Sequence, residues 1–328
     1  MLKKFKTVIS EIFQERSTHI LFVYYLSFMQ TTSKVLMVRP VRFGFNEETA
    51  QNNYFQQKSF CGSVAELALK EFDTFVNLLR GKDVDVWVVQ DTPEPWTPDS
   101  IFPNNWFSSH ITGELVLYPM FAKNRREERK AAAMDILLRK INHRKVIDLT
   151  RWEEEHEFLE GTGSMIFDRD KRIAYCCRSQ RSSEKVLRDF CSRMNYESVT
   201  FDAVDTGGKT IYHTNVMMSV GTQIAVVCTE SIRNEKERRR VVSKLTATGK
   251  VIVDISLDQV AQFAGNMLEV KSRNGQPIMV MSETARKSLT TEQERTIATY
   301  NKILAVPIPA IESNGGGSAR CMIAEIFY

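Results

Sequence analysis

Apolar side chains recur along this chain with two different spacings, which predict helices and strands in alternation. Spacings of three and four residues predict amphipathic helices over residues 65–79, 126–142, 183–194 and 235–248. Short runs rich in β-branched residues predict strands over residues 84–89, 115–118, 145–148, 173–177, 224–228 and 251–255. No linker rich in glycine, serine or proline divides the pattern, so a single α/β domain is expected.

A polar residue followed by a short apolar run recurs at intervals of roughly 55 residues. Five such units, each with strands and a helix, favour a radial array in which every unit brings one polar side chain to a shared axis. Strands that recur by chance in an α/β protein are the alternative. The residue types favour the array, because together they form a catalytic set rather than a packing set. They are Asp99, Glu160, His213, Asn266 and Cys321.

The composition is that of an ordinary folded protein with a small net charge. Hydrophobic residues make up 43% and charged residues 26% of the 328 residues, and the formal net charge is +4. Basic and acidic residues are interleaved, so the sequence gives no support for binding to nucleic acid or to a membrane. The six cysteines show neither a C-x-x-C pair nor zinc-ligand spacing, which predicts no metal site and no disulfide framework. We therefore expect a reducing compartment, the cytoplasm.

Residues 20–29 form an apolar stretch behind three lysines, which superficially resembles a short signal sequence. With about ten residues the stretch is too short to cross a bilayer, and no small-residue cleavage site follows it. The first core strand is expected at residues 34–40. We therefore interpret residues 1–33 as an N-terminal extension and residues 34–328 as the folded domain. A start at Met29, a membrane-proximal tag and a peripheral helix are the alternatives for residues 1–28.

Cys321 follows three consecutive glycines at residues 315–317. Glycines let the backbone approach a ligand closely and adopt positive φ, and amide N–H groups around a thiol favour the thiolate. Cys321 is therefore a candidate nucleophile. The alternative is a small buried hydrophobic residue at the start of a strand, which is what most free cysteines are.

Three further polar residues of the repeat suit chemistry at such a thiol. His213 could transfer a proton to a leaving group and activate water, although a single histidine in this setting is more often a core residue. Glu160 and Asp99 could hold a planar group with several N–H donors; a solvated loop glutamate and a turn cap are the alternatives. Together with Cys321, these residues predict an enzyme that acts on the guanidino or ureido carbon of a small, arginine-like molecule.

Six short motifs together resemble the amidinotransferase/arginine deiminase superfamily, the penteins, and most closely its citrulline-utilisation hydrolase branch. The resemblance runs from about residue 34 to residue 328 and implies a single catalytic domain, a five-bladed α/β propeller of ββαβ units. This fold agrees with the repeat found in the sequence. The motifs are VRP at 38–40, PDSIFPNNW at 98–106, LEG at 159–161, HTNV at 213–216, GNM at 265–267, and GGG at 315–317 ahead of Cys321.

The resemblance implies a role for each matching residue. Cys321 matches the family nucleophile, His213 the general acid/base, and Glu160 the carboxylate that binds substrate nitrogens and orients the histidine. Asp99 matches one of two aspartates that grip a guanidinium, and the second position, two residues after the histidine, holds Asn215. An aspartate there would repel the acceptor oxygen of a ureido group, whereas asparagine can donate to it. The exchange therefore favours citrulline over arginine.

Further substrate-binding residues are implied by the same resemblance. Arg181 resembles the arginine that binds the substrate's own carboxylate, and Arg125 or Arg126 is a second candidate. Asn105 lies in the motif around Asp99 and is also expected to bind substrate. Arg320 stands where the family often has histidine before the nucleophile; its charge could act on the thiol, and its role is left open.

The expected reaction is the hydrolysis of citrulline to ornithine, carbon dioxide and ammonia. The Cys321 thiolate attacks the ureido carbon, and amides of the glycine loop stabilise the tetrahedral intermediate. His213 protonates the departing amine and then activates water to release the covalent adduct. No metal or other cofactor is expected, a small amino acid is the partner implied, and a homo-oligomer is compatible with the sequence. The alternatives are an arginine or methylarginine deiminase, an amidinotransferase, and a binding propeller without catalysis.

Overall fold

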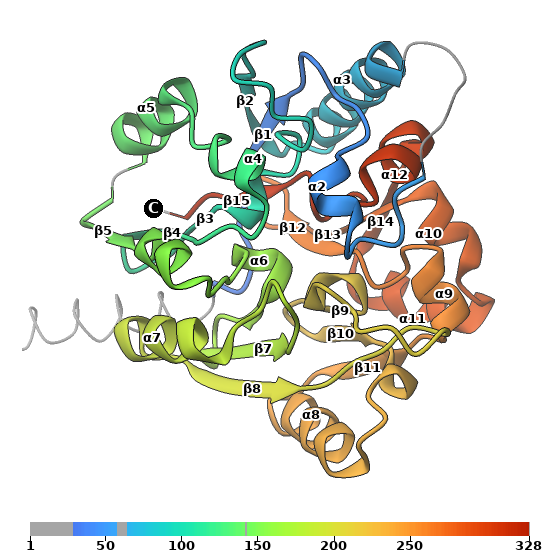
Figure 1. The fold of residues 1–328 in the computed structure, drawn as a ribbon. Coiled ribbons are helices and arrows are strands. Elements are labelled where there is room, and N and C mark those ends of the chain that lie inside the picture. Colours follow the sequence, from blue (N-terminus) through green and yellow to red (C-terminus); the bar gives the residue numbers. More distant parts are fainter. Residues whose placement is uncertain (1–28, 58–63, 142, 328) are drawn as a thin grey trace, which may run out of the picture.

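Five sheets of three strands form the framework of the computed structural model, which describes residues 29–57, 64–141 and 143–327 (Figure 1). In every sheet the middle strand pairs antiparallel with one neighbour and parallel with the other. Helices lie in the chain between the two parallel strands, because a parallel pair needs a long crossover connection. Each sheet therefore has the ββαβ order, if the C-terminal strand is counted with the first sheet.

Four sheets come from continuous stretches of chain, and Figure 1 shows them in chain order from green to orange. Two short helices lie between successive sheets, α6 (Gly161–Ser164) and α9 (Leu257–Ala261), and α12 (Pro309–Gly315) follows the last of the four. The elements of the four sheets are β3 (Phe107–Ser109), β4 (Glu114–Leu117), α4 (Lys123–Arg126), α5 (Ala131–Lys140) and β5 (Lys145–Asp148); β6 (Ile166–Asp168), β7 (Ile173–Cys177), α7 (Glu184–Met194) and β8 (Glu197–Phe201); β9 (Met218–Val220), β10 (Ile224–Val227), α8 (Glu235–Ala247) and β11 (Val251–Asp254); and β12 (Leu268–Lys271), β13 (Pro277–Ser282), α10 (Glu283–Ser288), α11 (Thr291–Tyr300) and β14 (Lys302–Val306).

The remaining sheet joins the two ends of the described chain. Its C-terminal strand pairs antiparallel with its N-terminal strand, with Val35 opposite Glu325. Because that C-terminal strand begins three residues after Cys321, the pairing places the candidate nucleophile close to the start of the fold. The elements of this sheet are β1 (Lys34–Arg39), α2 (Glu47–Ala50), α3 (Val64–Gly81), β2 (Asp85–Gln90) and β15 (Ala324–Glu325).

Helix α3 shows how the apolar pattern builds the core. Phe72, Phe75 and Leu79 are fully buried and lie on one face of the helix, since side chains three and four residues apart are neighbours there. They pack in one cluster with Val35 and Met37 of β1. The apolar stripe predicted over residues 65–79 is therefore the face that covers the first sheet.

Polar side chains explain where several helices begin. Ser183 accepts a hydrogen bond from the amide of Lys185 at the start of α7, and Asn234 accepts from two amides at the start of α8. Thr290 and Gln293 cap α11 reciprocally, side chain to backbone in both directions. Such caps satisfy amide groups that no helical carbonyl reaches.

The first strand of each sheet follows one polar residue of the repeat. Short turns connect residue and strand, such as the 3-10 turns Pro103–Asn105 and Thr214–Val216. The polar residues therefore hold equivalent places in five equivalent units. The pairs are Asp99 with β3, Glu160 with β6, His213 with β9, Asn266 with β12, and Cys321 with β15.

Most of the predicted elements are confirmed. The helices over residues 65–79, 183–194 and 235–248 correspond to α3, α7 and α8, and the predicted strands are present to within one residue at each end. The helix over residues 126–142 is wrong in extent, because α4 ends at Arg126 and α5 begins at Ala131. Lys130 between them is extended, and its Nζ lies 2.8 Å from Asp91 at the end of β2. This tie to the neighbouring sheet interrupts the helix. Asn142 is outside the described residues.

The chain before β1 belongs to the packed interior from Gln30 onward. The Gln30 side chain donates to the carbonyls of Phe167 at 2.8 Å and Val220 at 2.9 Å, and accepts from the amide of Arg169 at 2.6 Å. Residues 30–32 are buried. Packed residues therefore extend at least four positions before residue 34, where the domain was expected to begin. Residues 1–28, with most of the apolar stretch, are outside the described residues.

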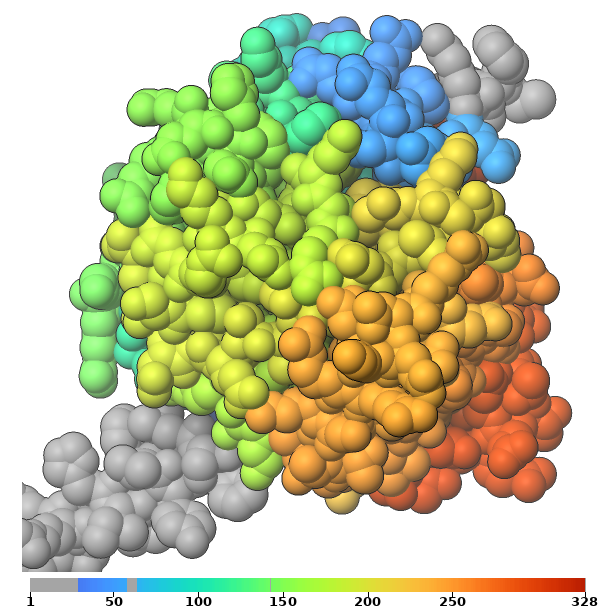
Figure 2. Space-filling view, turned by 60° about the horizontal axis from the view of Figure 1, so that its bottom comes forward, coloured from blue at the N-terminus to red at the C-terminus, as the bar shows by residue number. Residues whose placement is uncertain are grey.

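Successive units adjoin at the molecular surface. Figure 2 shows the side of α7 and α8 as a continuous surface on which the chain colours follow one another from green to orange. None of the helices in the described ranges combines the length and the apolar character needed to cross a bilayer.

Candidate active site

The Cys321 sulfur lies between two asparagine amides. Asn215 Nδ2 donates to Sγ at 3.3 Å and Asn266 Nδ2 at 3.2 Å. Cys321 is only 6% exposed, so these bonds act where little water competes and a donor stabilises charge more than it would in solvent. The sulfur is therefore the shared acceptor of two side-chain amides.

The chain reaches Cys321 through the glycine loop that follows α12. Gly316 has φ +62°, in the left-handed region, and its carbonyl accepts from the Tyr212 hydroxyl at 2.9 Å. A Cβ at Gly317 would lie 2.9 Å from the Phe102 ring and 3.3 Å from Cys321 Cβ. The tight turn and the close contact with Phe102 therefore require the glycines that the sequence singled out.

His213 and Glu160 form a buried pair. Nε2 lies 2.7 Å from Oε2, and the other carboxylate oxygen accepts from the amide of Phe121 at 2.9 Å. Because an ionised carboxylate only accepts, Nε2 carries the proton and Nδ1 is the basic atom. Gly163 faces that atom: a Cβ there would come within 2.8 Å of Nδ1. The absence of a side chain at Gly163 keeps room on the reactive side of the ring.

Burial and neighbouring charges set the protonation of this pair. Burial would raise the pKa of Glu160, but Arg181 and His213 lower it to about 2. Burial lowers the pKa of His213 to about 4, against the raising effect of Glu160. At neutral pH Glu160 is ionised and the imidazole of His213 is neutral, which is the form that accepts a proton.

Asp99 is held by one of its two carboxylate oxygens. Oδ2 accepts from Asn46 Nδ2 at 2.8 Å and from Thr49 Oγ1 at 3.0 Å, and Arg125 Nε lies 4.0 Å away. Burial raises the pKa of Asp99, and Arg125 opposes this. The buried Oδ1 finds no hydrogen-bond partner among the described residues. A buried acceptor of this kind calls for a partner, which a substrate N–H can supply.

Three asparagines carry further buried atoms that no group of the described chain satisfies: Oδ1 and Nδ2 of Asn104, Nδ2 of Asn105 and Oδ1 of Asn215. Asn105 Oδ1 accepts from Arg125 Nη1 at 2.7 Å, and Asn215 Nδ2 faces the sulfur, so these contacts fix the orientation of both amides. With Asp99 Oδ1, the set contains three acceptors and two donors.

The two predicted carboxylate-binding arginines are tied into the protein. Arg125 donates to both oxygens of Glu128, at 2.7 and 3.0 Å. Burial would lower the pKa of Arg125, yet Glu128 raises it above its usual value. Arg181 Nε donates to Asn52 Oδ1 at 2.8 Å, and its Nη1 lies 3.5 Å from Glu160. Both guanidiniums border the site, and their binding of a substrate carboxylate stays a prediction.

Contacts connect the eight predicted site residues into three groups. The groups of His213 and Asn105 meet where residue 163 lacks a side chain, because a Cβ there would touch both Asn105 Nδ2 and His213 Nδ1. Asn215, which donates to the sulfur, follows His213 by two residues in the chain. The groups are Cys321 with Asn215; His213 with Glu160 and Arg181; and Arg125 with Asn105 and Asp99.

A chain segment at residues 46–57, which contains α2, crosses the site from outside. Asn53 and Gln56 donate to the carbonyl of Gly315 at 3.2 and 3.1 Å, and residues 46, 49 and 52 bond to Asp99 and Arg181 as described above. Figure 1 shows this blue segment between α4 and α12. The 46–57 segment therefore covers the carboxylate, the arginine and the glycine loop together.

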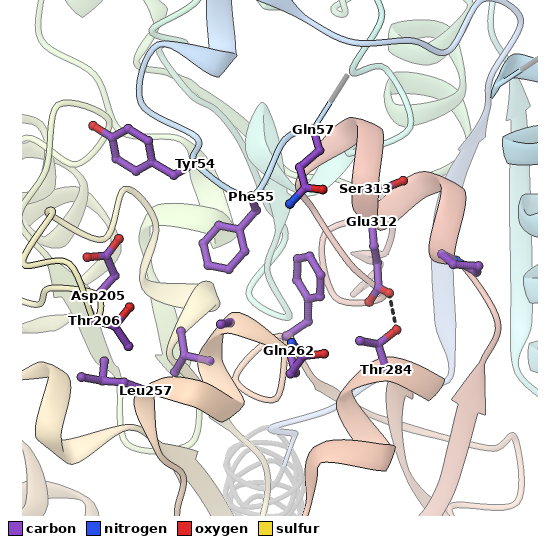
Figure 3. Close-up of a pocket in the computed structure, with 14 residues that line it drawn as sticks. Tyr54, Phe55, Gln57, Asp205, Thr206, Leu257, Gln262, Thr284, Glu312 and Ser313 are labelled. Atoms are coloured by element: carbon purple, nitrogen blue, oxygen red, sulfur yellow. Dashed lines mark hydrogen bonds between the residues drawn. The ribbon is translucent and has the colours of Figure 1, made fainter. Parts of the chain in front are cut away.

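Two cavities flank the 46–57 segment. One, of about 430 Å³, lies between Phe55, Phe263 and Glu312 (Figure 3), where Glu312 accepts from Thr284 Oγ1 at 2.6 Å. The other, of about 630 Å³, opens over Tyr212, whose ring centre lies 4.8 Å from that of His213. The second cavity therefore shares a wall with the histidine–glutamate pair.

Several residues of the site were not assigned from the sequence. Asn266 occupies one of the repeat positions in the sequence, and its contact with the sulfur could have been predicted from that position. Asn104 is adjacent to the predicted Asn105. Glu128, which neutralises Arg125, carries no sequence signal, because its partner is set by the fold.

Comparison with known protein families gives one match. Residues 39–328 match the family described as N,N dimethylarginine dimethylhydrolase, eukaryotic. The chain belongs to this family. No curated protein matches the sequence.

Three solved structures illustrate the similarity in fold. One is the substrate-bound N-terminal domain of ArgZ, and ArgZ is an arginine dihydrolase from the ornithine–ammonia cycle in cyanobacteria. This domain is 16% identical to the chain, with a TM-score of 0.67, and the match covers 90% of this chain and 98% of that one. Unliganded AgrE has 16% identity and a TM-score of 0.72, over 89% and 39%. A dimethylarginine dimethylaminohydrolase adduct with S-methyl-L-thiocitrulline has 13% identity and a TM-score of 0.62, over 90% and 99%. At these identities the likeness shows the fold alone.

Membership in the dimethylarginine dimethylhydrolase family confirms the predicted superfamily. It also confirms an enzyme, a hydrolase of C–N bonds other than peptide bonds. The matching family is not the citrulline branch that the sequence suggested. The choice between citrulline and arginine-like substrates therefore has to be argued from the site.

Proposed function

We propose that this member of the dimethylarginine dimethylhydrolase family hydrolyses the ureido group of citrulline through a covalent adduct on Cys321. Arginine or a methylated arginine is the second candidate, favoured by the family match and by the carboxylate of Asp99. The observation that carries the proposal is the mixture of donors and acceptors among the unsatisfied buried atoms beside the catalytic residues.

Hydrogen-bond matching separates the two substrates. A guanidinium offers only donors, whereas a ureido group offers an acceptor oxygen as well as N–H donors. Asp99 Oδ1 and Asn215 Oδ1 can accept from either group, but the Nδ2 donors of Asn104 and Asn105 require an acceptor. A guanidinium would leave these donors unpaired, at a cost of about 1–3 kcal/mol for each buried group. The ureido oxygen removes that cost.

The balance of charge in the site supports the second candidate. Three buried carboxylates, Asp99, Glu128 and Glu160, face the two buried guanidiniums of Arg125 and Arg181. Glu128 pairs with Arg125, and Glu160 lies within 3.5 Å of Arg181. Asp99 is then the one carboxylate of this set without a close cationic partner, since Arg125 Nε is 4.0 Å away. The set therefore holds one more carboxylate than guanidinium, and this charge count by itself suits a cationic guanidinium, the second candidate.

The first half of the reaction forms the adduct. The thiol proton of Cys321 passes to His213 Nδ1, and the thiolate attacks the ureido carbon. The carbon becomes tetrahedral and its oxygen negative, and N–H donors around the sulfur stabilise that charge. His213 then protonates the departing amine, which leaves as ammonia. The carbonyl carbon stays bonded to Cys321 Sγ and to the side-chain nitrogen of ornithine, as an S-carbamoyl adduct. Glu160 stabilises the imidazolium at the moment it forms.

The second half releases the adduct. His213 is neutral again and takes a proton from a water molecule, which attacks the adduct carbon. The C–S bond breaks, the thiolate is restored, and the carbamate of ornithine that leaves decomposes to ornithine and carbon dioxide. The low pKa of His213, about 4, keeps the imidazole in its proton-accepting form throughout the neutral range.

The substrate's amino-acid end is proposed to lie towards the cavity over Tyr212. This cavity is lined by Asn52 and Gln180 and lies beside Arg181, whose guanidinium carbon is 4.9 Å from the centre of the Tyr212 ring. Arg181 and Arg125 remain the candidates for holding the α-carboxylate. Because Cys321 and His213 are 6% and 3% exposed, access requires the 46–57 segment to move.

The proposal includes a five-bladed propeller as the arrangement of residues 34–328. Five ββαβ sheets that follow one another in chain order support it, as does the pairing of β15 with β1, which would close the ring. A propeller explains why each unit contributes one polar residue to a single site.

The decisive experiment compares substrates. The purified protein is incubated separately with citrulline, arginine and dimethylarginine, and ornithine, citrulline and ammonia are measured. We expect ornithine and ammonia from citrulline. Intact citrulline beside consumed arginine or dimethylarginine would replace the proposal with the second candidate. Cys321→Ser should abolish turnover, whereas Cys191→Ser, a matched change at another buried free cysteine, should retain it.

A further inference from the structure

The cavity of about 430 Å³ beside the 46–57 segment is separate from the catalytic residues. None of the eight predicted site residues lines it. Its walls come from the 46–57 segment, the turn that follows β8, helix α9 with the residues after it, and parts of α10 and α12. A cavity of this size holds a small organic molecule.

Two aromatic rings form an apolar wall of this cavity. The ring centres of Phe55 and Phe263 lie 5.4 Å apart, and both rings are partly buried against the core beside Val260. Phe263 has φ +63°, which is rare for a bulky side chain. Residues in such conformations gather at ligand sites. The wall suits a hydrocarbon chain, and the faces of its rings also attract cations.

A buried carboxylate closes the cavity on the side of α12. Glu312 is 4% exposed, and its two oxygens accept from Ser318 Oγ and Thr284 Oγ1, each at 2.6 Å. Both partners are neutral hydroxyls, and no lysine, arginine or histidine of the described ranges forms an ion pair with Glu312. A carboxylate has room for more than two hydrogen bonds, and a buried one calls for a cation.

The charges around the cavity are mainly negative. Among the described residues its walls contain two carboxylates, Asp205 and Glu312, and no cationic side chain. Glu71 is a third carboxylate near Glu312, and it accepts from two amides at the start of α12. One cation reaches the edge: Lys209 Nζ lies 3.9 Å from the centre of the Tyr54 ring, and Lys209 itself lines the larger cavity. Three carboxylates against one ammonium favour a cationic ligand.

We propose that this cavity is a second binding site, which takes an aliphatic diamine: one ammonium group binds Glu312, the other lies at Asp205, and the carbon chain packs on the aromatic wall. In the view of Figure 3, Asp205 and Glu312 lie on opposite sides of Phe55, an arrangement that suits a molecule with a charge at each end. Alkyl ammonium groups keep their protons at neutral pH, as lysine does. The inference does not depend on the proposed hydrolysis.

The test is isothermal titration calorimetry of the purified full-length protein with 1,5-diaminopentane at pH 7. We expect one molecule to bind per chain. The matched probe is 1-aminopentane, which has the same carbon chain and only one ammonium group. It should bind about threefold weaker, because Asp205 is partly exposed and its attraction is screened.

Two variants remove the proposed charges one at a time. Glu312→Gln keeps an acceptor oxygen for a neighbouring hydroxyl but loses the negative charge. It should weaken binding of the diamine about tenfold or more, the loss expected for a hydrogen bond between charged groups. Asp205→Asn should weaken binding about threefold.

Two further variants are controls. Asp258→Asn makes the same charge change at an exposed position of α9 outside the cavity wall, and should keep the wild-type affinity. Asp99→Asn removes a carboxylate of the candidate active site and should also keep it, because the diamine does not bind there.

The inference would be overturned by a diamine that does not bind at millimolar concentration, by unchanged affinity in Glu312→Gln, or by weaker binding in Asp99→Asn. If Glu312→Gln does not fold, Asp205→Asn decides: weaker binding than in Asp258→Asn supports the site, and equal binding contradicts it. The measurement needs no turnover. Failure to hydrolyse citrulline would therefore count against the proposed function and leave this test intact.

Discussion

At the scale of single residues, amides rather than carboxylates surround the Cys321 sulfur. Asn215 and Asn266 donate to it, and the buried Asn105 offers a further unsatisfied donor. Cys321, His213 and Asn215 could be recognised as site candidates from the sequence, because a thiol, an imidazole and an amide each suit only a few chemical roles. Which amide atom lacks a partner could not, because that depends on neighbours from other units.

Asn215→Asp should turn the enzyme away from citrulline. An aspartate removes the donor to the sulfur and places a negative charge beside the thiolate. Losing a hydrogen bond to a charged group costs about 1.5–3 kcal/mol, so kcat/KM for citrulline should fall about 10- to 100-fold. The ratio of kcat/KM for arginine to that for citrulline should rise. Asn274→Asp, exposed on the surface, is the matched control, and an unchanged ratio in Asn215→Asp would refute the role of the amide.

The buried imidazole of His213 should make the protein less stable in acid. Its pKa in the fold, about 4, lies below the usual 6.5, so the unfolded chain takes up a proton that the folded chain refuses. This contribution to stability is intact above pH 6.5 and is lost as the pH falls towards 4. Between pH 7 and pH 5 it amounts to about 2 kcal/mol.

Urea unfolding of the wild type and of His213→Gln at pH 7 and pH 5 measures this term. The wild type should lose more stability than the variant over that interval. Equal losses would show that His213 is not held neutral in the fold.

At the scale of elements, long periodic segments were predictable and short ones were not. Helices α3, α7 and α8 each bury one apolar stripe, so their spacing was visible in the sequence. Strands β3, β6 and β9 have three residues each, too few for a period to show. The helix expected over residues 126–142 is two helices, because Lys130 is drawn to Asp91, a contact between units that a local pattern does not contain.

The turn into β6 sets the reactive side of the imidazole. A Cβ at Gly163 would press on Asn105 and come within 2.8 Å of His213 Nδ1. Gly163→Ala should therefore displace the ring and lower kcat about 100-fold, since small misplacements of catalytic groups cost that much.

Steady-state kinetics with citrulline test this expectation, and thermal unfolding shows whether the fold survives. Gly81→Ala, where the added Cβ meets nothing within 4 Å, is the control and should keep wild-type kcat. A Gly163→Ala enzyme of wild-type activity would mean that Nδ1 is not the proton-transferring atom.

At the scale of the whole molecule, the site is assembled from residues that are far apart in the chain. Asn215 and Cys321 are 106 positions apart, and Asn53 and Gly315 are 262 apart. The repeat in the sequence predicted that polar residues at equivalent positions of different units lie together, as Glu160 and His213 do and as Asn266 and Cys321 do. It also predicted that each unit contains strands and a helix. It could not anticipate Glu128 or the 46–57 segment, because these lie outside the repeat and are positioned by packing between units.

Gln30 holds two of the units together from the inside. Its side chain bonds to β6 and the residue after it, and to β9, through three backbone groups. Gln30→Ala should leave those groups unpaired in the interior and lower the free energy of unfolding by about 3 kcal/mol. Urea denaturation measures this, with exposed Gln262→Ala as the control. A change below about 0.5 kcal/mol, the usual range for surface substitutions, would show that the chain before β1 is not part of the core.

The central claim, that the Cys321 sulfur bonds to the ureido carbon of citrulline, is tested most directly by mass spectrometry of protein quenched in acid during turnover. We predict that the peptide containing Cys321 gains the mass of citrulline less ammonia, and that the gain disappears when citrulline is exhausted. Turnover of citrulline without any modification of Cys321, or turnover by Cys321→Ser, would contradict the account.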